Sequence, residues 1–201
     1  MGLFSKNKQI SVSVFCGAEE GNKKYYAQMA NNLGKLLAKN KMRLVYGAGG
    51  KGLMGCVARG VLDNGGKIFG VTTKIIAAFE KPIKGTKTKY TPNIQKRKRT
   101  FIDNSDAFIV LPGGFGTFDE LFDLLTGKEI INKYNEEVAS KKINETRPII
   151  IVNYKGYFKQ FDVLMNFLIK EGFMKKDNKK IYQMVSTPEE AVKLIKKTVK
   201  K

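Results

Sequence analysis

The sequence predicts an α/β protein with a Rossmann-like, doubly wound parallel sheet and helices on both faces. Three observations predict this fold: short apolar runs recur along the chain, segments of helical spacing separate them, and glycine-rich turns follow three of the runs. Strands dominated by apolar residues are typical of a parallel sheet that is covered on both faces. The 201 residues are expected to form a single domain, 1–201, with a short polar segment at 1–9.

The elements follow one another in alternation. Short runs rich in apolar residues predict six strands, at 10–16, 44–46, 67–71, 107–111, 149–152 and 181–185. Apolar residues three or four positions apart predict helices over 22–39, 53–64, the segment after Thr117, 161–171 and 188–200. Thr187 suits the N-cap of the last helix, and a further helix is expected to carry the basic run 95–99.

Two segments, 72–93 and 132–147, show no clear periodicity. The first segment is too long for a plain connection, and we expect it to fold over the functional site. The polar composition of the second segment predicts a loop. Ligands of doubly wound sheets bind beyond the carboxyl ends of the strands, where the strand order switches. The glycine-rich turns at Gly17, 47–52 and 113–116 each follow a strand, so we expect them to converge on one site.

The chain has no histidine, which excludes Ser-His-Asp catalysis, Cys-His catalysis and histidine-ligated zinc. Acid–base chemistry must then come from Glu, Asp, Lys, Tyr or water. Cys16 and Cys56 lie in apolar surroundings and are expected to be buried thiols in a reducing compartment. The chain also lacks a long apolar run and the apolar core of a signal peptide, so we expect a cytoplasmic protein without membrane partners.

The formal net charge of +19 is large for this length. It could indicate a nucleic-acid surface, attraction of phosphorylated metabolites, or solvated faces filled with lysine. The lysines are scattered along the chain and no basic stripe is interleaved with aromatic residues. We therefore favour solvated lysines, with steering of phosphates as a side benefit, and do not expect a nucleic-acid partner.

The run Leu111-Pro112-Gly113-Gly114-Phe115-Gly116-Thr117-Phe118-Asp119-Glu120 follows one predicted strand and opens a helix. Its glycines allow a close approach of the backbone to a ligand, and the free amides of a helix start bind anions. The run lacks the Gly-Lys-Ser/Thr of a Walker A loop, and the turn after the first strand lacks the three-glycine spacing of a dinucleotide site. Glu120 lies about one turn into the helix. A carboxylate does not favour the binding of a neighbouring anion, so we expect Glu120 to take part in the reaction instead of in binding.

Arg97 lies just before the strand that delivers this run. The basic run around it is typical of a solvated helix face, but its guanidinium suits phosphate or ribose oxygens. Arg97-Lys98 and 112–120 together resemble the RK and PGGxGTxxE signatures of the LOG ("lonely guy") family. These are cytokinin riboside 5'-monophosphate phosphoribohydrolases, often mislabelled lysine decarboxylases. Residues 46–55 resemble the family's YGGGxxGLMG turn, and the similarity spans about 10–190.

The resemblance implies a homodimer that cleaves the N-glycosidic bond of AMP or N6-substituted AMP to a free base and ribose 5-phosphate, without a metal or organic cofactor. It implies that Arg97 and Glu120 are catalytic, and that the substrate contacts Glu80, Lys98, Gly113, Gly114, Gly116, Thr117, Asp119 and Thr126. A carboxylate can stabilise the oxocarbenium-like cation of this reaction. Water or Arg97 would protonate the leaving base. We expect Arg97 and Glu120 on opposite sides of one sugar.

The sequence also departs from the family. Gln95 replaces a common histidine, 18–20 reads Ala-Glu-Glu instead of a serine-rich turn, and 126–128 lacks the usual Trp. These differences concern the choice of base more than bond cleavage. A nucleotide-binding sensor or carrier without turnover is the alternative hypothesis. Lysine decarboxylation is disfavoured, because no lysine resembles a pyridoxal-phosphate site with its partners.

Overall fold

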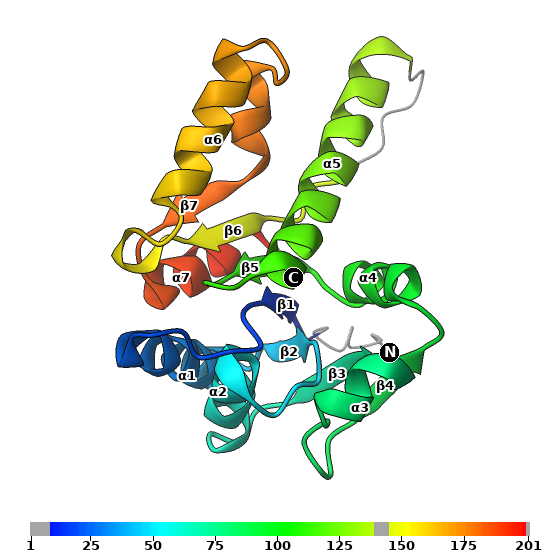
Figure 1. The fold of residues 1–201 in the computed structure, drawn as a ribbon, viewed down its shortest axis with the longest axis vertical. Coiled ribbons are helices and arrows are strands. Elements are labelled where there is room, and N and C mark those ends of the chain that lie inside the picture. The colour runs from blue at the N-terminus through cyan, green and yellow to red at the C-terminus, as the bar shows by residue number, and fades with distance from the viewer. Residues whose placement is uncertain (1–8, 139–144, 200–201) are drawn as a thin grey trace, which may run out of the picture.

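The computed structural model describes residues 9–138 and 145–199, so most of the predicted polar segment 1–9 lies outside the described residues. They form one seven-stranded parallel sheet in the order β4-β3-β2-β1-β5-β6-β7 (Figure 1). The predicted fold class is confirmed. The strands are β1 (Ser11–Phe15), β2 (Arg43–Tyr46), β3 (Ile68–Thr73), β4 (Thr88–Thr91), β5 (Ala107–Val110), β6 (Ile149–Val152) and β7 (Gln183–Val185).

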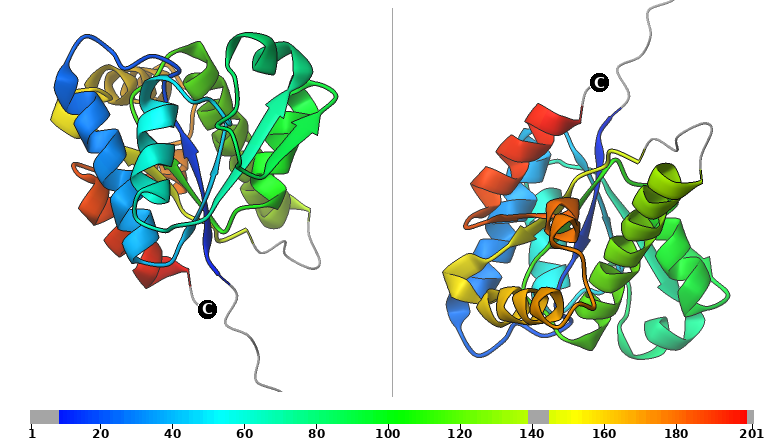
Figure 2. Two further views of the ribbon diagram at one scale, coloured as in Figure 1. Left: turned by 90° about the horizontal axis from the view of Figure 1, so that it is seen from below. Right: turned by 90° about the horizontal axis from the view of Figure 1, so that it is seen from above.

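Helices cover both faces of the sheet (Figure 2). They are α1 (Lys24–Lys39), α2 (Gly52–Leu62), α3 (Lys74–Phe79), α4 (Ile94–Asp103), α5 (Phe115–Glu137), α6 (Lys159–Lys170) and α7 (Pro188–Thr198), with 3₁₀ turns at Tyr154–Gly156 and Lys176–Ile181. Residues of α1, α2 and α7 share one apolar cluster with Val12 and Val14. Residues of α4, α5 and α6 share the opposite cluster with Phe15. In the described part of the chain, no helix is long and apolar enough to cross a bilayer.

The strand order switches between β1 and β5. From β1 the chain steps outward to β4, and it then returns to place β5 on the other side of β1, with Val14 paired to Ile109. The turns that follow these two strands meet, because the Gly17 amide donates a hydrogen bond of 2.9 Å to the Pro112 carbonyl. This juxtaposition opens the crevice in which ligands of doubly wound sheets bind.

Two segments differ from the sequence prediction. Residues 72–93 contain α3 and the edge strand β4, which pairs in parallel with β3. Strand β4 could not be predicted from an apolar pattern, because its two central residues are exposed and are polar or aromatic. The predicted loop at 132–147 is wrong for 132–137, because α5 continues to Glu137; positions 139–144 lie outside the described residues. The final turns of α5 carry few apolar residues and project beyond the sheet (Figure 1).

Helices α1 and α2 touch through their backbones, and this contact yields a stability prediction. A Cβ atom on Gly34 would lie 2.2 Å from the Val57 carbonyl oxygen. We expect Gly34→Ala to lower the free energy of unfolding by about 2–3 kcal/mol, since a close-packed contact must open. The matched control is Gly127→Ala in α5, where a Cβ meets nothing within 4 Å. In the control, the free energy of unfolding measured in urea should increase by about 0.5–1 kcal/mol. Equal unfolding midpoints for the two variants would contradict the contact.

Candidate active site

The glycine-rich start of α5 forms an open anion-binding turn. Gly114 is the N-cap, and the first turn holds neither a capping side chain nor an acidic residue. A Cβ on Gly113 would lie 2.1 Å from Thr117 Oγ1 and 2.7 Å from the Gly17 amide nitrogen, so only glycine fits there. The first amides of a helix have no intrahelical acceptor. This helix start can therefore receive an anion, as the sequence predicted.

A cavity of about 570 Å³ lies beside this turn at the strand-order switch. That volume is within the range of sites for small molecules. Its lining joins the turn after β1, the start of α2, α3 and the start of α5. The turn at 47–52 also reaches this region, because Gly49 and Gly50 line an adjoining hollow. The predicted convergence of the three glycine-rich turns is confirmed.

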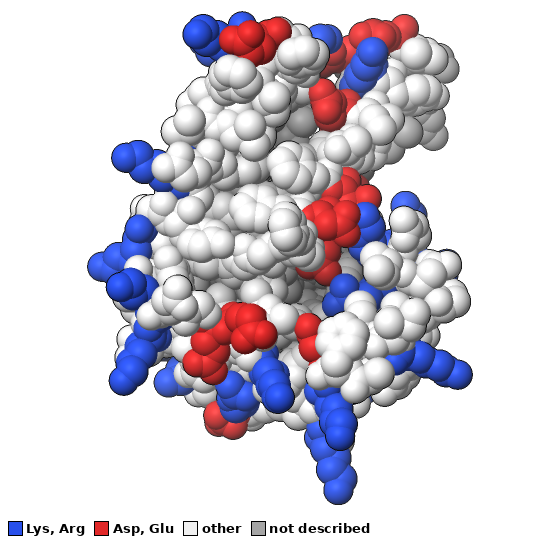
Figure 3. Space-filling model, in the orientation of Figure 1, with Lys and Arg blue, Asp and Glu red and all other residues white. Residues whose placement is uncertain are grey.

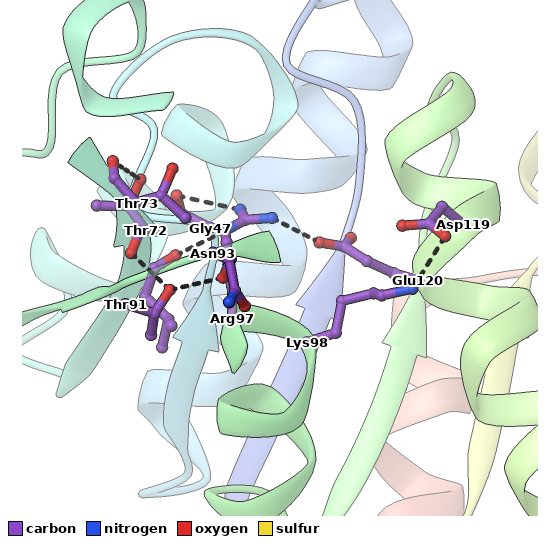
Figure 4. A network of polar contacts seen from close by, with 10 residues as sticks. Gly47, Thr72, Thr73, Thr91, Asn93, Arg97, Lys98, Asp119 and Glu120 are labelled. Carbon is purple, nitrogen blue, oxygen red and sulfur yellow. Dashed lines mark hydrogen bonds and ion pairs between the residues drawn. The ribbon is translucent and has the colours of Figure 1, made fainter. Parts of the chain in front are cut away.

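Arg97 enters the cavity from α4 and is held on several sides (Figure 4). Its Nε donates to the Val71 carbonyl at 3.1 Å, and the guanidinium carbon lies 4.8 Å from the centre of the Phe101 ring. Gly47 leaves room for the guanidinium, since a Cβ there would lie 2.5 Å from Nη2. The orientation of this cation is therefore fixed by the fold.

Glu120 meets Arg97 directly, with 3.1 Å between Oε1 and Nη1. The two side chains are only 12% and 11% exposed. Burial raises the pKa of Glu120 to about 7, although the charge of Arg97 opposes this rise. The carboxyl therefore changes its charge near neutral pH. The two groups do not lie on opposite sides of an open space as expected, but in contact on one wall of the cavity.

The other predicted site residues fall into two groups. Glu80, Gly113, Gly114, Gly116 and Thr117 line the cavity, and burial raises the pKa of Glu80 against the opposing charge of Arg97. The remaining three, Lys98, Asp119 and Thr126, are not among its lining residues.

Lys98 is engaged by carboxylates outside the cavity. Its Nζ lies 3.0 Å from Asp119 Oδ1 and 3.4 Å from Asp123 Oδ1. Burial lowers the pKa of Lys98, but the hydrogen bond to Asp119 and the two negative charges outweigh burial and raise it. Thr126 lies further along α5 and is exposed. Lys98 and Asp119 adjoin Arg97 and Glu120 in sequence, and successive side chains on a helix point in different directions.

Several residues that line the cavity were not predicted as site residues, among them Tyr26, Phe79, Phe115 and Tyr157. The Tyr157 hydroxyl donates to the Gly113 carbonyl at 2.7 Å, and its ring packs against that of Tyr26. A signal for Tyr157 existed, because it follows the strand beside the one that delivers the glycine run. Phe115 is 98% exposed, and its place between two glycines of the anion-binding run was a signal that it is not a core residue.

Comparisons with known proteins agree with the motifs. The model of a protein family described as "Possible lysine decarboxylase" matches residues 54–195. A cytokinin riboside 5'-monophosphate phosphoribohydrolase of Arabidopsis thaliana is 34% identical over 200 residues, which cover 98% of this chain and 85% of the relative. A protein with the same activity in its name, from Rhodococcoides fascians, is 33% identical over 166 residues, covering 82% and 78% of the two chains.

Solved structures share the fold. The molybdenum cofactor binding protein of the phototrophic bacterium Rippkaea orientalis superposes with a TM-score of 0.67 at 18% identity, covering 96% of this chain and 98% of its own. The Moco carrier protein of Chlamydomonas reinhardtii superposes with a TM-score of 0.66 at 17% identity, covering 95% and 98%. At these identities the similarity concerns the architecture alone.

Proposed function

Because this chain belongs to the LOG family of cytokinin riboside 5'-monophosphate phosphoribohydrolases, we propose that it hydrolyses the N-glycosidic bond of AMP or of an N6-substituted AMP. The products are the free base and ribose 5-phosphate. One observation carries the proposal: a buried carboxylate, Glu120, is paired with Arg97 in the wall of a cavity that also includes an open helix start.

The substrate phosphate binds at the start of α5 in this proposal. Backbone amides and the helix dipole offset its negative charge there. Glu120 lies about one helical turn beyond this anchor and so reaches the region of the sugar. Arg97 holds the carboxylate in place and offers its remaining N–H groups to ribose or phosphate oxygens.

Bond cleavage leaves positive charge on the ribose. The bond between C1′ and the base nitrogen breaks, and its electron pair leaves with the base. The ionised Glu120 stabilises the resulting oxocarbenium-like cation, then takes a proton from the water whose oxygen bonds to C1′. A second water protonates the base, because an arginine guanidinium stays protonated in proteins. The hydroxide that this water leaves takes the proton from Glu120, which returns to its ionised form. The net reaction adds one water across the glycosidic bond.

The direct test incubates the purified chain with AMP and quantifies adenine and ribose 5-phosphate by chromatography. A parallel panel contains an N6-alkylated AMP, adenosine, ADP and ATP. The proposal requires stoichiometric base and ribose 5-phosphate from at least one monophosphate. Calorimetric binding of monophosphates without any product over hours would instead establish a sensor or carrier.

The raised pKa of Glu120 predicts how the activity depends on pH. Only the ionised form stabilises a cation, and burial places the pKa at about 7, so kcat/KM for AMP should rise with pH through about 7. The phosphate of the substrate titrates at about pH 6, about one unit below Glu120, so the fit of the profile must include both ionisations. Measurement of kcat/KM between about pH 5 and about pH 9 checks the prediction. A profile with no rise above the phosphate ionisation would contradict the role of Glu120.

A further inference from the structure

The cavity beside α5 offers little positive charge to a phosphate. Four carboxylates line it, those of Glu19, Glu20, Glu80 and Glu120. Arg97 is the only cation among the described lining residues, and Glu120 already engages it. In the space-filling view, acidic side chains gather around the central hollow and most basic ones lie toward the periphery (Figure 3). Attraction of an anion therefore depends on the backbone amides at the start of α5 and on the direction in which they point.

Two consecutive peptide groups of the anion-binding turn are anchored by their carbonyls. The Pro112 carbonyl accepts the Gly17 amide at 2.9 Å, and the Gly113 carbonyl accepts the Tyr157 hydroxyl at 2.7 Å. The peptide bonds of the described residues are trans, so the N–H and the C=O of one peptide group point in opposite directions. The Tyr157 hydroxyl thus turns the Gly114 amide away from itself. No described residue accepts a hydrogen bond from this amide, which stays available to an anion.

The peptide group between Gly113 and Gly114 needs such an anchor, because glycine on both sides leaves it free to rotate. A flip would carry φ of Gly114 from −95° into the positive region, which glycine tolerates. It would also present the Gly113 carbonyl, with its partial negative charge, in place of the amide. The restraint cannot come from a larger residue at 113, since a Cβ there would lie 2.1 Å from Thr117 Oγ1. The hydrogen bond from Tyr157 supplies it instead.

Tyr157 is itself held in place by its neighbours. Its ring packs edge-on against the rings of Tyr26 and Phe158, with centroids 5.8 Å and 5.0 Å away. Phe158 is buried, and its amide donates to Asn153 Oδ1 at 2.7 Å. The ring is therefore fixed between α1 and the segment that follows β6. Its hydroxyl loses little conformational freedom when it binds Gly113.

We propose that Tyr157 is a positioning residue for the substrate phosphate. Its hydroxyl fixes the peptide group between Gly113 and Gly114, so that the Gly114 amide faces the anion. This role rests on the proposed function for the nucleotide as ligand. Tyr157 acts through the backbone and takes no part in bond cleavage.

The test compares Tyr157→Phe with Tyr154→Phe. Both changes remove one hydroxyl from the same short segment after β6, but Tyr154 packs against Tyr25 and does not line the cavity. Calorimetry with ribose 5-phosphate measures the binding of the phosphate without turnover. We expect its Kd to rise about three- to tenfold in Tyr157→Phe, the usual effect of losing one neutral hydrogen bond, and to stay at the wild-type value in Tyr154→Phe.

Kinetics separate positioning from a general loss of structure. In Tyr157→Phe the KM for AMP should rise by a similar factor, whereas kcat should stay within about twofold of the wild type, because the pair of Arg97 and Glu120 is not touched. An unchanged Kd in Tyr157→Phe, with circular dichroism showing the native fold, would overturn the role. An equal rise in Tyr154→Phe, or a wild type that does not bind ribose 5-phosphate, would do the same. A wild type that binds it but releases no adenine from AMP would refute the proposed function, and the Kd values would still decide the role of Tyr157.

Alanine at position 114 gives an independent check. A Cβ on Gly114 meets nothing within 4 Å, and alanine disfavours the positive φ that a flipped peptide requires. The Kd of Gly114→Ala/Tyr157→Phe should therefore lie within about twofold of that of Gly114→Ala alone. The same rise of Kd in both backgrounds would overturn the proposal. If the alanine itself blocks the ligand, the comparison of Tyr157→Phe with Tyr154→Phe decides.

Discussion

Glu120→Gln is expected to lower kcat for AMP hydrolysis by about 10³-fold or more. The substitution keeps the size of the side chain but removes the negative charge that stabilises the ribosyl cation and accepts the proton of water. Substrate binding should change far less, because in the proposed mechanism the phosphate is held by backbone amides at the start of α5 and not by Glu120. Adenine release at saturating AMP gives kcat, and calorimetry gives the affinity.

Glu136→Gln is the matched control for this experiment. It lies on the same helix, is exposed and is not among the cavity-lining residues, so its kcat should equal that of the wild type. A Glu120→Gln variant that retains more than about a tenth of the wild-type kcat would remove Glu120 from the chemistry. The proposed reaction could then stand only with another base.

Arg97→Lys is expected to lower kcat/KM by about 10²-fold or more, even though the positive charge is kept. A single ammonium cannot replace the fork that donates to the Val71 carbonyl and to Glu120 at the same time. The charge and hydrogen bond of Arg97 oppose the effect of burial on Glu120, and a lysine would oppose it less. The pKa of Glu120 should therefore rise further, and the rise of activity with pH should move to higher pH. Kinetics across the pH range measure both effects.

Arg99→Lys provides the comparison on the same helix. Its side chain is 67% exposed and pairs with Asp103 on the surface, so the change should leave kcat/KM within about twofold of the wild type. If Arg97→Lys matched Arg99→Lys in rate and in pH profile, the geometry of the Arg97 fork would have no part in catalysis.

Most of the fold and the position of the candidate site could be predicted from the sequence. Buried strands such as β5 and β6 are apolar throughout, and the glycine turns that follow strands identify one edge of the sheet. Their convergence follows from topology, because the carboxyl ends of parallel strands meet at one edge. The edge strand β4 was not predictable in the same way, since an exposed strand needs no apolar pattern.

Side-chain directions were harder to predict. Arg97 and Glu120 are 23 positions apart, and only the packing of α4 beside the start of α5 brings them within 3.1 Å of each other. Lys98 and Asp119 are paired with each other instead of lining the cavity, which depends on the rotation of each helix about its axis. Motif positions carry no information on that rotation.

The contact between Gly34 of α1 and the backbone of α2 has a mechanical consequence. Two helices in backbone contact cannot shift against each other without losing close-packed contacts, and the turns at 17–23 and 47–52 are attached to these helices. By contrast, α3 borders the cavity without a single buried residue. We therefore expect any adjustment to a ligand on the α3 side of the cavity, and little movement of the wall built on α1 and α2.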